Sequence, residues 1–106
     1  MKKQIEDIIK IKIAISLRKL LYRNKSNVSR KENRKDIVDS YEKISMNADI
    51  RKATVSSAFN GETRTSMTTL ILIIEAMEYN LKDFAEVYDK ITENEIASFK
   101  KEFLYN

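Results

Sequence analysis

Cations, hydroxyls and carboxylates are the side chains of this sequence that could do chemistry, because the chain contains no histidine and no cysteine. This composition removes the commonest general base, the thiolate ligands of metal sites and every disulfide. Lysine and arginine side chains suit a different task, since they neutralise phosphate groups when a protein binds a polyanion. The residue types therefore favour the binding of an anion over the making and breaking of bonds.

The charges divide along the chain in a way that supports this interpretation. Residues 1–60 hold 15 Lys/Arg against 7 Asp/Glu, a net charge of +8, whereas residues 61–106 hold 5 against 9, a net charge of −4. Such a split predicts one surface for a polyanion and another for a different contact. The alternative is that a chain with 34% charged residues uses them only to solvate its helices.

The carboxylates Glu75, Glu78 and Glu86 are the nearest approach to a catalytic group. Their spacing on helices favours a solvated face over an active site. The sequence has no nucleophile paired with a base, no metal-ligand cluster and no glycine-rich loop that could cradle a phosphate. We therefore expect a protein that is not an enzyme, with no catalytic residues, no metal site, no cofactor and no small-molecule ligand.

Residues 24–35, NKSNVSRKENRK, form a polar and basic segment. Its cations could touch phosphates, but a solvated loop is slightly favoured. Ser29 and Glu32 have the spacing of a capping box, which predicts a helix from near Arg30 that runs on to Ala48. Its apolar face would comprise Ile37, Val38, Tyr41, Ile44 and Ala48. The alternative is a mobile loop as far as Lys35.

The elements that position these groups are expected to be helices in one domain, residues 1–106. The chain has no proline and one glycine, so it has few helix breakers. The first helix is predicted over Gln4–Arg23, although alternating isoleucines at 9–15 could also favour a strand. Its apolar stripe is Ile5, Ile9, Ile13, Leu17 and Leu20/Leu21, widened by Ile8, Ile11 and Ile15. So broad an apolar face must be covered by the bundle or by a second subunit.

Three more helices follow a turn at residues 47–50. The first spans residues 51–60 and ends at Asn60-Gly61, a left-handed stop. Ser66 caps a helix over Met67–Glu78, which is apolar on most sides and predicted to be the central buried helix, with its methionines as core fillers. Asn80 caps a helix over Leu81–Lys90 that is expected to bury Leu81, Phe84, Ala85 and Tyr88.

A last helix is predicted over residues 93–104, opened by the capping box Thr92-x-x-Glu95 and carrying Phe99 and Phe103 one turn apart. The start MKKQIEDIIKIKI lacks the long apolar core of a signal peptide. The longest apolar run, residues 70–74, is far too short to cross a membrane. We expect a cytoplasmic protein with no membrane partner.

An ordered set of residues from Ser40 to Phe84 resembles the XRE or Cro-like helix-turn-helix family, the lambda-repressor-like domains. The set is Ile50, Thr54-Val55-Ser56, Asn60-Gly61, Ser66, Met67-x-x-Leu70, Ala76-Met77 and Leu81-x-x-Phe84. Ile13, Leu17, Arg18 and Leu20 resemble the family's first helix. The resemblance implies an all-α, compact helical bundle with a family-like core at about residues 13–88. To that core this chain would add an N-terminal extension (1–12), the inserted basic segment (24–35) and a C-terminal helix (92–104).

The sequence departs from the family's pattern at two positions of interest. Asp49 stands where the family usually has a glycine in the turn, and aspartate tolerates a left-handed backbone better than most residues. Tyr41 stands where the family often has a glutamine that contacts phosphate. The connection between the first and second helices is also longer than usual.

The resemblance implies a transcriptional regulator that binds double-stranded DNA in the nucleoid and reads the major groove with residues 51–60. The implied base-reading residues are Arg51, Lys52, Ala53, Ser56 and Ser57, and the implied phosphate contacts are Tyr41, Lys43, Asn60, Thr63 and Arg64. Thr54 and Val55 are expected to face the core, and Arg18 and Lys19 to pair with carboxylates. A homodimer joined through the N-terminal helix and residues 96–104 would set two reading helices about 34 Å apart. The alternative is a protein-interaction module of the same fold, such as an antitoxin-like or regulatory partner.

Overall fold

The structure is a computed structural model that describes residues 2–28 and 37–104. Within these ranges every regular element is helical, so the expectation of an all-α chain is confirmed. The elements are α1 (Lys2–Val28), α2 (Tyr41–Ala48), α3 (Lys52–Phe59), α4 (Met67–Ala76), α5 (Leu81–Asp89), α6 (Glu93–Phe99) and the π-helical turn η2 (Lys100–Leu104). No helix in these ranges is long and apolar enough to span a membrane.

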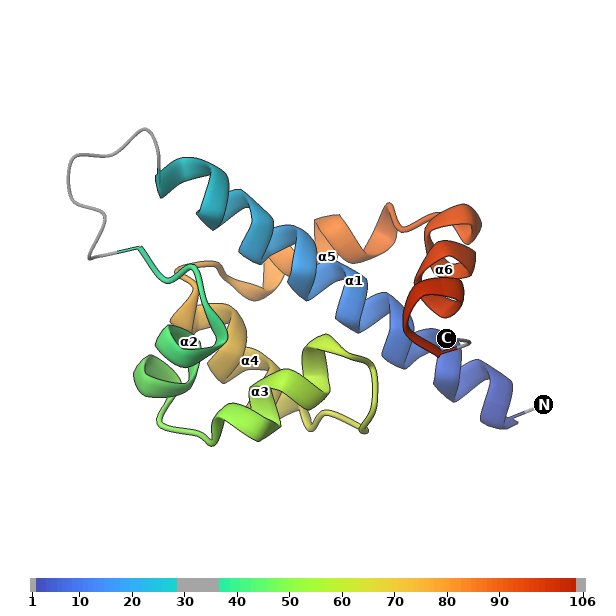
Figure 1. Ribbon diagram of the computed structural model, residues 1–106, viewed down its shortest axis with the longest axis horizontal. Coiled ribbons are helices and arrows are strands. Elements are labelled where there is room, and N and C mark those ends of the chain that lie inside the picture. Colours follow the sequence, from blue (N-terminus) through green and yellow to red (C-terminus); the bar gives the residue numbers. More distant parts are fainter. Residues whose placement is uncertain (1, 29–36, 105–106) are drawn as a thin grey trace.

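The long helix α1 is the axis around which the other helices pack. Figure 1 shows α1 crossing the molecule, with α2, α3 and α4 on one side and α5 and α6 on the other. It contacts α3, α5 and α6, while α2 contacts both α3 and α4. The molecule measures 47 × 29 × 26 Å along its principal axes. Since no glycine or proline interrupts it, α1 continues beyond the predicted limits at both ends.

Only the central part of α1 is buried, which corrects the predicted apolar stripe. Leu17, Leu20 and Leu21 enter the main core as expected. Ile5 and Ile9 are instead 59% and 43% exposed, because the first turns of α1 project past the helices that cover its middle. A second, smaller core lies on α1 between these exposed turns and the main core. It comprises Ile11, Ala14, Ile15 and Phe99, with Ile91 and Ile96 packed against it.

The predicted helix from near Arg30 to Ala48 is wrong at Ile37 and Val38. These two residues are buried but not helical, and α2 begins at Tyr41 after the N-cap Ser40, whose hydroxyl accepts the Lys43 amide proton at 3.2 Å. The Asn24 amide of α1 donates to the Val38 carbonyl at 2.8 Å, which occupies the acceptor that a continuing helix would have used. The proposed capping box at Ser29 and Glu32 lies outside the described residues.

Helix α4 is the central apolar helix, but it is not buried on every side, since Leu72 is 37% exposed. Leu70, Ile73, Ile74 and Ala76 are buried. Ser66 caps the helix as predicted, with its hydroxyl accepting the Thr69 amide proton at 3.1 Å. The helix ends at Ala76, earlier than expected, because Glu78 adopts a left-handed conformation with φ of 69°.

The methionines of this region play different parts. Met77, just after α4, fills the core at 1% exposure, as predicted. Met67 is 58% exposed, so the core-filling prediction is wrong there. Met67 belongs to the first turn of α4, where the helix starts at the surface after the 62–65 connection.

The last helices begin where the sequence predicts. Capping boxes form at Asn80 with Asp83 and at Thr92 with Glu95. Helix α5 buries Phe84 and Val87, whereas Leu81 and Ala85, which were predicted to be buried, are exposed. These two residues lie one turn apart, on the exposed face of α5.

The predicted C-terminal helix is divided between α6 and η2. The rings of Phe99 and Phe103 stack across this junction with centroids 4.6 Å apart. Phe99 is buried against α1, and Phe103 is 41% exposed. One ring of the pair, at the end of α6, therefore lies in the core, and the other, in η2, lies at the surface.

Candidate functional site

Two short helices joined by a three-residue turn form the most distinctive surface unit of the molecule. Helix α2 ends in Asp49, whose φ of 55° is left-handed, and the amide of Ile50 donates to the Ser45 carbonyl at 3.1 Å. Aspartate tolerates this backbone conformation, as the sequence predicted. The ring of Tyr41 at the start of α2 lies 4.7 Å from that of Phe59 at the end of α3. The two helices are thus fixed to each other at both ends.

The first turn of α3 presents its side chains to solvent. Arg51, Lys52, Ala53 and Thr54 are all exposed, while Val55 is fully buried. The prediction for Val55 is therefore confirmed, and that for Thr54 is wrong because Thr54 lies on the outer face of the helix. Two cations and a hydroxyl thus stand together at one accessible helix end.

Further along α3 the candidate residues are less accessible. Ser56 and Ser57 are half-buried, and the Asn60 amide donates to the Ser56 hydroxyl at 3.3 Å. Arg18 of α1 donates to the Asn60 side-chain oxygen and to the Phe59 carbonyl, both at 2.7 Å. Asn60 therefore joins α3 to α1 in this structure.

The two basic residues Arg18 and Lys19 behave differently from each other. Lys19 pairs with Glu95 at 2.5 Å, as expected. Arg18 was also expected to pair with a carboxylate, but it donates instead to the Phe59 backbone carbonyl and to the Asn60 side-chain oxygen at the end of α3. The carbonyl of the last residue of a helix lacks a partner within the helix, so the Arg18 guanidinium satisfies that of Phe59.

Two of the proposed phosphate contacts form surface ion pairs. Lys43 contacts the carboxylate of Asp39 at 2.9 Å and the carbonyl of Ile37 at 3.2 Å. Arg64 contacts Glu6 of α1 at 2.6 Å, yet its side chain is 76% exposed. Thr63 is exposed in the same connection, between α3 and α4.

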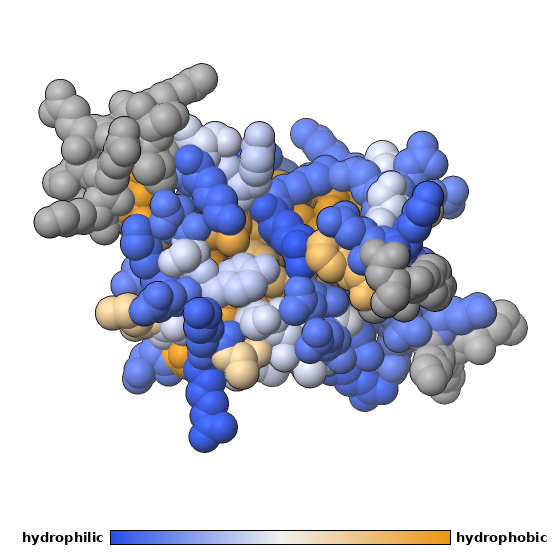
Figure 2. All heavy atoms as spheres, viewed as in Figure 1, coloured by the Kyte–Doolittle hydropathy of each residue, from blue (hydrophilic) through white to orange (hydrophobic). Residues whose placement is uncertain are grey.

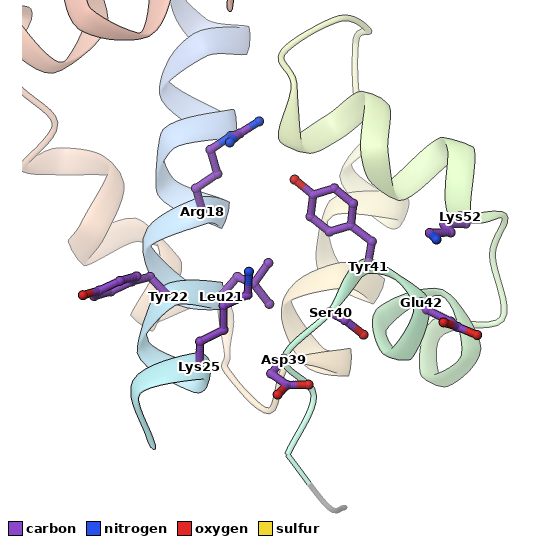
Figure 3. A pocket seen from close by; sticks show the side chains of 9 residues that line it. All are labelled: Arg18, Leu21, Tyr22, Lys25, Asp39, Ser40, Tyr41, Glu42 and Lys52. Carbon is purple, nitrogen blue, oxygen red and sulfur yellow. The ribbon is translucent and has the colours of Figure 1, made fainter. Parts of the chain in front are cut away.

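A cavity of about 470 Å³ lies between α1, the start of α2 and the start of α3. Its lining residues are Arg18, Leu21, Tyr22, Lys25, Asp39, Ser40, Tyr41, Glu42 and Lys52. Figure 3 shows the Arg18 and Tyr41 side chains approaching each other from α1 and α2. The structure thus brings the predicted residues Tyr41 and Lys52 together, whereas Lys43, Thr63 and Arg64 do not line this cavity.

Three cations and two carboxylates line the cavity, and the N-terminus of α2 opens beside it. A helix N-terminus carries a partial positive charge, so the cavity favours an anion. Tyr22 was missed by sequence reasoning because no pattern marks it. Lys25 belonged to the predicted basic segment, and its position in the last turn of α1 brings it to this site.

Hydrophilic residues cover most of the face that includes α2 and α3, as Figure 2 shows. The candidate site is therefore an open polar surface with a basic helix end, not an enclosed apolar pocket. Comparison with protein-family models, curated proteins and solved structures finds no match for this chain.

Proposed function

We propose that this protein is a transcriptional regulator that binds double-stranded DNA sequence-specifically, inserting α3 into the major groove as one half of a homodimer. The observation that carries the proposal is the exposed first turn of α3, with Arg51 and Lys52, on a pair of helices that pack together through Tyr41 and Phe59. In helix-turn-helix proteins the N-terminal residues of the second helix contact the base edges.

The dimensions of α3 suit this role. A helix of eight residues is about 12 Å long, and the major groove is about 12 Å wide and admits one helix. Arg51 can donate two hydrogen bonds to a guanine, and Thr54 can contact a base or a thymine methyl. We therefore propose Arg51, Lys52, Ala53 and Thr54 as the first readers, with Ser56 and Ser57 one turn on.

Phosphate contacts would hold the helix in register. Lys25 and Lys52 flank the cavity at the N-terminus of α2, where a backbone phosphate can approach Tyr41. Lys43 and Arg64 are paired in the free protein, but surface ion pairs contribute only about 0–1 kcal/mol. Lys43 can therefore leave Asp39, and Arg64 can leave Glu6, to bind a phosphate at little cost in free energy. Both cations remain candidates for phosphate contacts. Thr63 completes the proposed set, whereas the side chain of Asn60, also expected at a phosphate, is bonded to Arg18 and Ser56 in the free protein.

Exposed isoleucines on α1 favour the dimer. Ile5, Ile8 and Ile9 are 59%, 37% and 43% exposed on the first turns of this helix. A neighbouring subunit that covered them would remove this apolar surface from water, which is the main driving force of association. The same surface also favours the alternative, a module of this fold that binds a different protein.

Titration of a labelled duplex at several salt concentrations tests the proposal. A DNA-binding protein should lose affinity steeply as salt rises, because bound cations release counterions from the duplex. Arg51→Ala should weaken binding, whereas Lys90→Ala, an exposed cation after α5, should not. Equal loss in both variants would show that net charge, and not α3, drives binding. No measurable binding at low salt would overturn the proposal and favour a protein partner.

A further inference from the structure

The guanidinium of Arg18 lies at the meeting point of three elements. It projects from α1, donates hydrogen bonds to the end of α3 and lies under the rings of α6 and η2. Figure 3 shows this side chain extending from α1 in the direction of α3. Among the cations of the described ranges, Arg18 alone both bonds the end of α3 and lies against the rings of the C-terminal segment.

On the α3 side, the contacts are two short hydrogen bonds. Arg18 Nε donates to the Phe59 carbonyl oxygen and Nη2 donates to Asn60 Oδ1, each at 2.7 Å. Asn60 in turn donates to Ser56 Oγ at 3.3 Å. Ser56 is one of the residues proposed to approach DNA, so the chain of contacts runs from α1 into the reading helix.

On the other side, the contact is a pair of aromatic rings. The Arg18 Cζ atom lies 4.3 Å from the ring centroid of Phe103 and 5.5 Å from that of Phe99. A planar guanidinium can donate hydrogen bonds from its edge while its face stacks on a ring. The aromatic face therefore restrains the guanidinium that holds the end of α3.

We propose that Phe103 is a positioning residue, which orients the reading helix α3 through Arg18 without touching DNA. The C-terminal segment α6–η2 thus acts as a brace on Arg18. The brace determines how firmly the C-terminus of α3 is held in place and, through this, the affinity for DNA. The link to affinity rests on the proposed function, whereas the mechanical link from Phe103 to α3 does not.

The burial of the two rings makes this brace adjustable. Phe99 anchors α6 in a buried cluster with Ile11, Ala14 and Ile15. Phe103 is 41% exposed and borders an open groove of about 700 Å³ between α1 and α6. A change at Phe103 can therefore alter the restraint on Arg18 while the anchor of α6 and the main core stay in place.

Hydrogen exchange without DNA tests the mechanical link. Phe103→Leu keeps an apolar side chain but loses the ring. In this variant the backbone amides of Asn60 and Glu62 and the Arg18 Nε–H should exchange faster. The expected acceleration is roughly two- to fivefold, which is the fold-change that corresponds to the loss of an exposed cation–π contact. Phe103→Tyr keeps the ring face and should restore slow exchange. Leu81→Ala is the matched control, because Leu81 of α5 is 42% exposed, as Phe103 is 41% exposed. This variant also removes apolar surface but should change none of the three exchange rates.

The same variants then test the link to DNA. Phe103→Leu should weaken duplex binding by a similar factor, and Phe103→Tyr should bind as the unmodified chain does. Unchanged exchange at Asn60 and Glu62 in Phe103→Leu would overturn the brace, and so would equal acceleration in Phe103→Tyr. Faster exchange with unchanged affinity would overturn the role in binding. If the unmodified chain binds no duplex, the proposed function fails, and the exchange rates alone still decide whether the brace exists.

Discussion

Within residues 2–28 and 37–104, two residues other than glycine adopt the left-handed conformation, and both lie at helix ends. Asp49 closes α2 with φ of 55°, and Glu78 follows α4 with φ of 69°. For an L-residue this conformation costs about 1–2 kcal/mol, less for aspartate and asparagine, whose side chains bond locally. Glutamate lacks that advantage, so Glu78 is the more strained of the two.

Glu78→Gly should therefore stabilise the fold by about 1 kcal/mol, because glycine adopts this conformation freely. Urea unfolding monitored by circular dichroism measures the change. Glu75→Gly provides a matched control, since Glu75 is an exposed residue inside α4 and glycine there costs about 1 kcal/mol. Destabilisation in both variants would contradict the assignment of strain to Glu78.

Asn24 is the buried polar residue that ties three segments together. Its amide donates to the carbonyls of Val38 at 2.8 Å and Met77 at 3.1 Å, and its oxygen accepts from the Tyr79 hydroxyl at 2.8 Å. All its polar atoms are satisfied, as buried groups require. The non-helical segment before α2 and the end of α4 are thereby fixed to α1.

Asn24→Ala should destabilise the protein by about 1–3 kcal/mol for each carbonyl left buried and unpaired. Tyr79→Phe removes only the third hydrogen bond and should cost less. Thermal or urea unfolding of the two variants gives the comparison. If Tyr79→Phe lowers the free energy of unfolding more than Asn24→Ala does, the hydrogen bonds of the Asn24 amide are not what fixes the segment before α2 to α1.

At the scale of elements, α6 is attached to α1 partly by charge. The hydrogen bond from Lys19, followed by the backbone hydrogen bond at Thr92, holds the pKa of Glu95 below its ordinary value. A carboxylate whose pKa is lower in the folded state contributes stability above its unfolded pKa and loses it as the pH falls through the folded value. The attachment of α6 should therefore weaken in acid, below the ordinary glutamate range.

Amide exchange in α6 as a function of pH tests this expectation, after correction for the intrinsic pH dependence of exchange. Protection of α6 should fall in acid for the unmodified chain, and the fall should be smaller in Glu95→Gln, which has no charge to lose at this position. Because both side chains of the pair are partly exposed to solvent, the effect should also shrink at high salt. The same pH profile in both proteins would contradict the role given to Glu95.

Most elements could be predicted from local signals, and the errors have specific physical causes. Ser66, Asn80 and Thr92 cap helices because their side chains bond the adjacent amides, and these contacts need only neighbouring residues. The start of α2 was misplaced because Asn24, 14 positions away from Val38, takes the carbonyl that a longer helix would use. Such a contact between distant segments leaves no local pattern.

Only those residues of the candidate site that lie at a helix end could be predicted from the sequence. Arg51 and Lys52 follow a recognisable turn, and both are exposed. The outward position of Thr54, by contrast, depends on which face of α3 packs on α2, and the internal hydrogen bonds of Asn60 depend on Arg18. The contact between Phe103 and Arg18 depends on the junction of α6 and η2, and helical periodicity in the sequence does not predict that junction.

At the scale of the whole molecule, the projecting first turns of α1 bear on the oligomeric state. If a second copy covers Ile5 and Ile9, Ile9→Lys should convert a dimer to a monomer, because a buried unpaired charge is costly. Sedimentation equilibrium over a concentration series measures this. Met46→Lys, at a 73% exposed position on α2, serves as the control and should leave the dimer intact. A monomer at every concentration in the unmodified chain would contradict the proposed dimer.

Selection of bound duplexes from a random DNA pool tests the central claim most directly. A regulator that reads DNA with α3 should enrich a palindrome whose half-sites lie about one helical turn apart, and Arg51→Ala should relax one base position in each half-site. Enrichment of no sequence, with weak binding that disappears at modest salt, would contradict the account. The exposed end of α3 would then have to be explained as a surface for another protein.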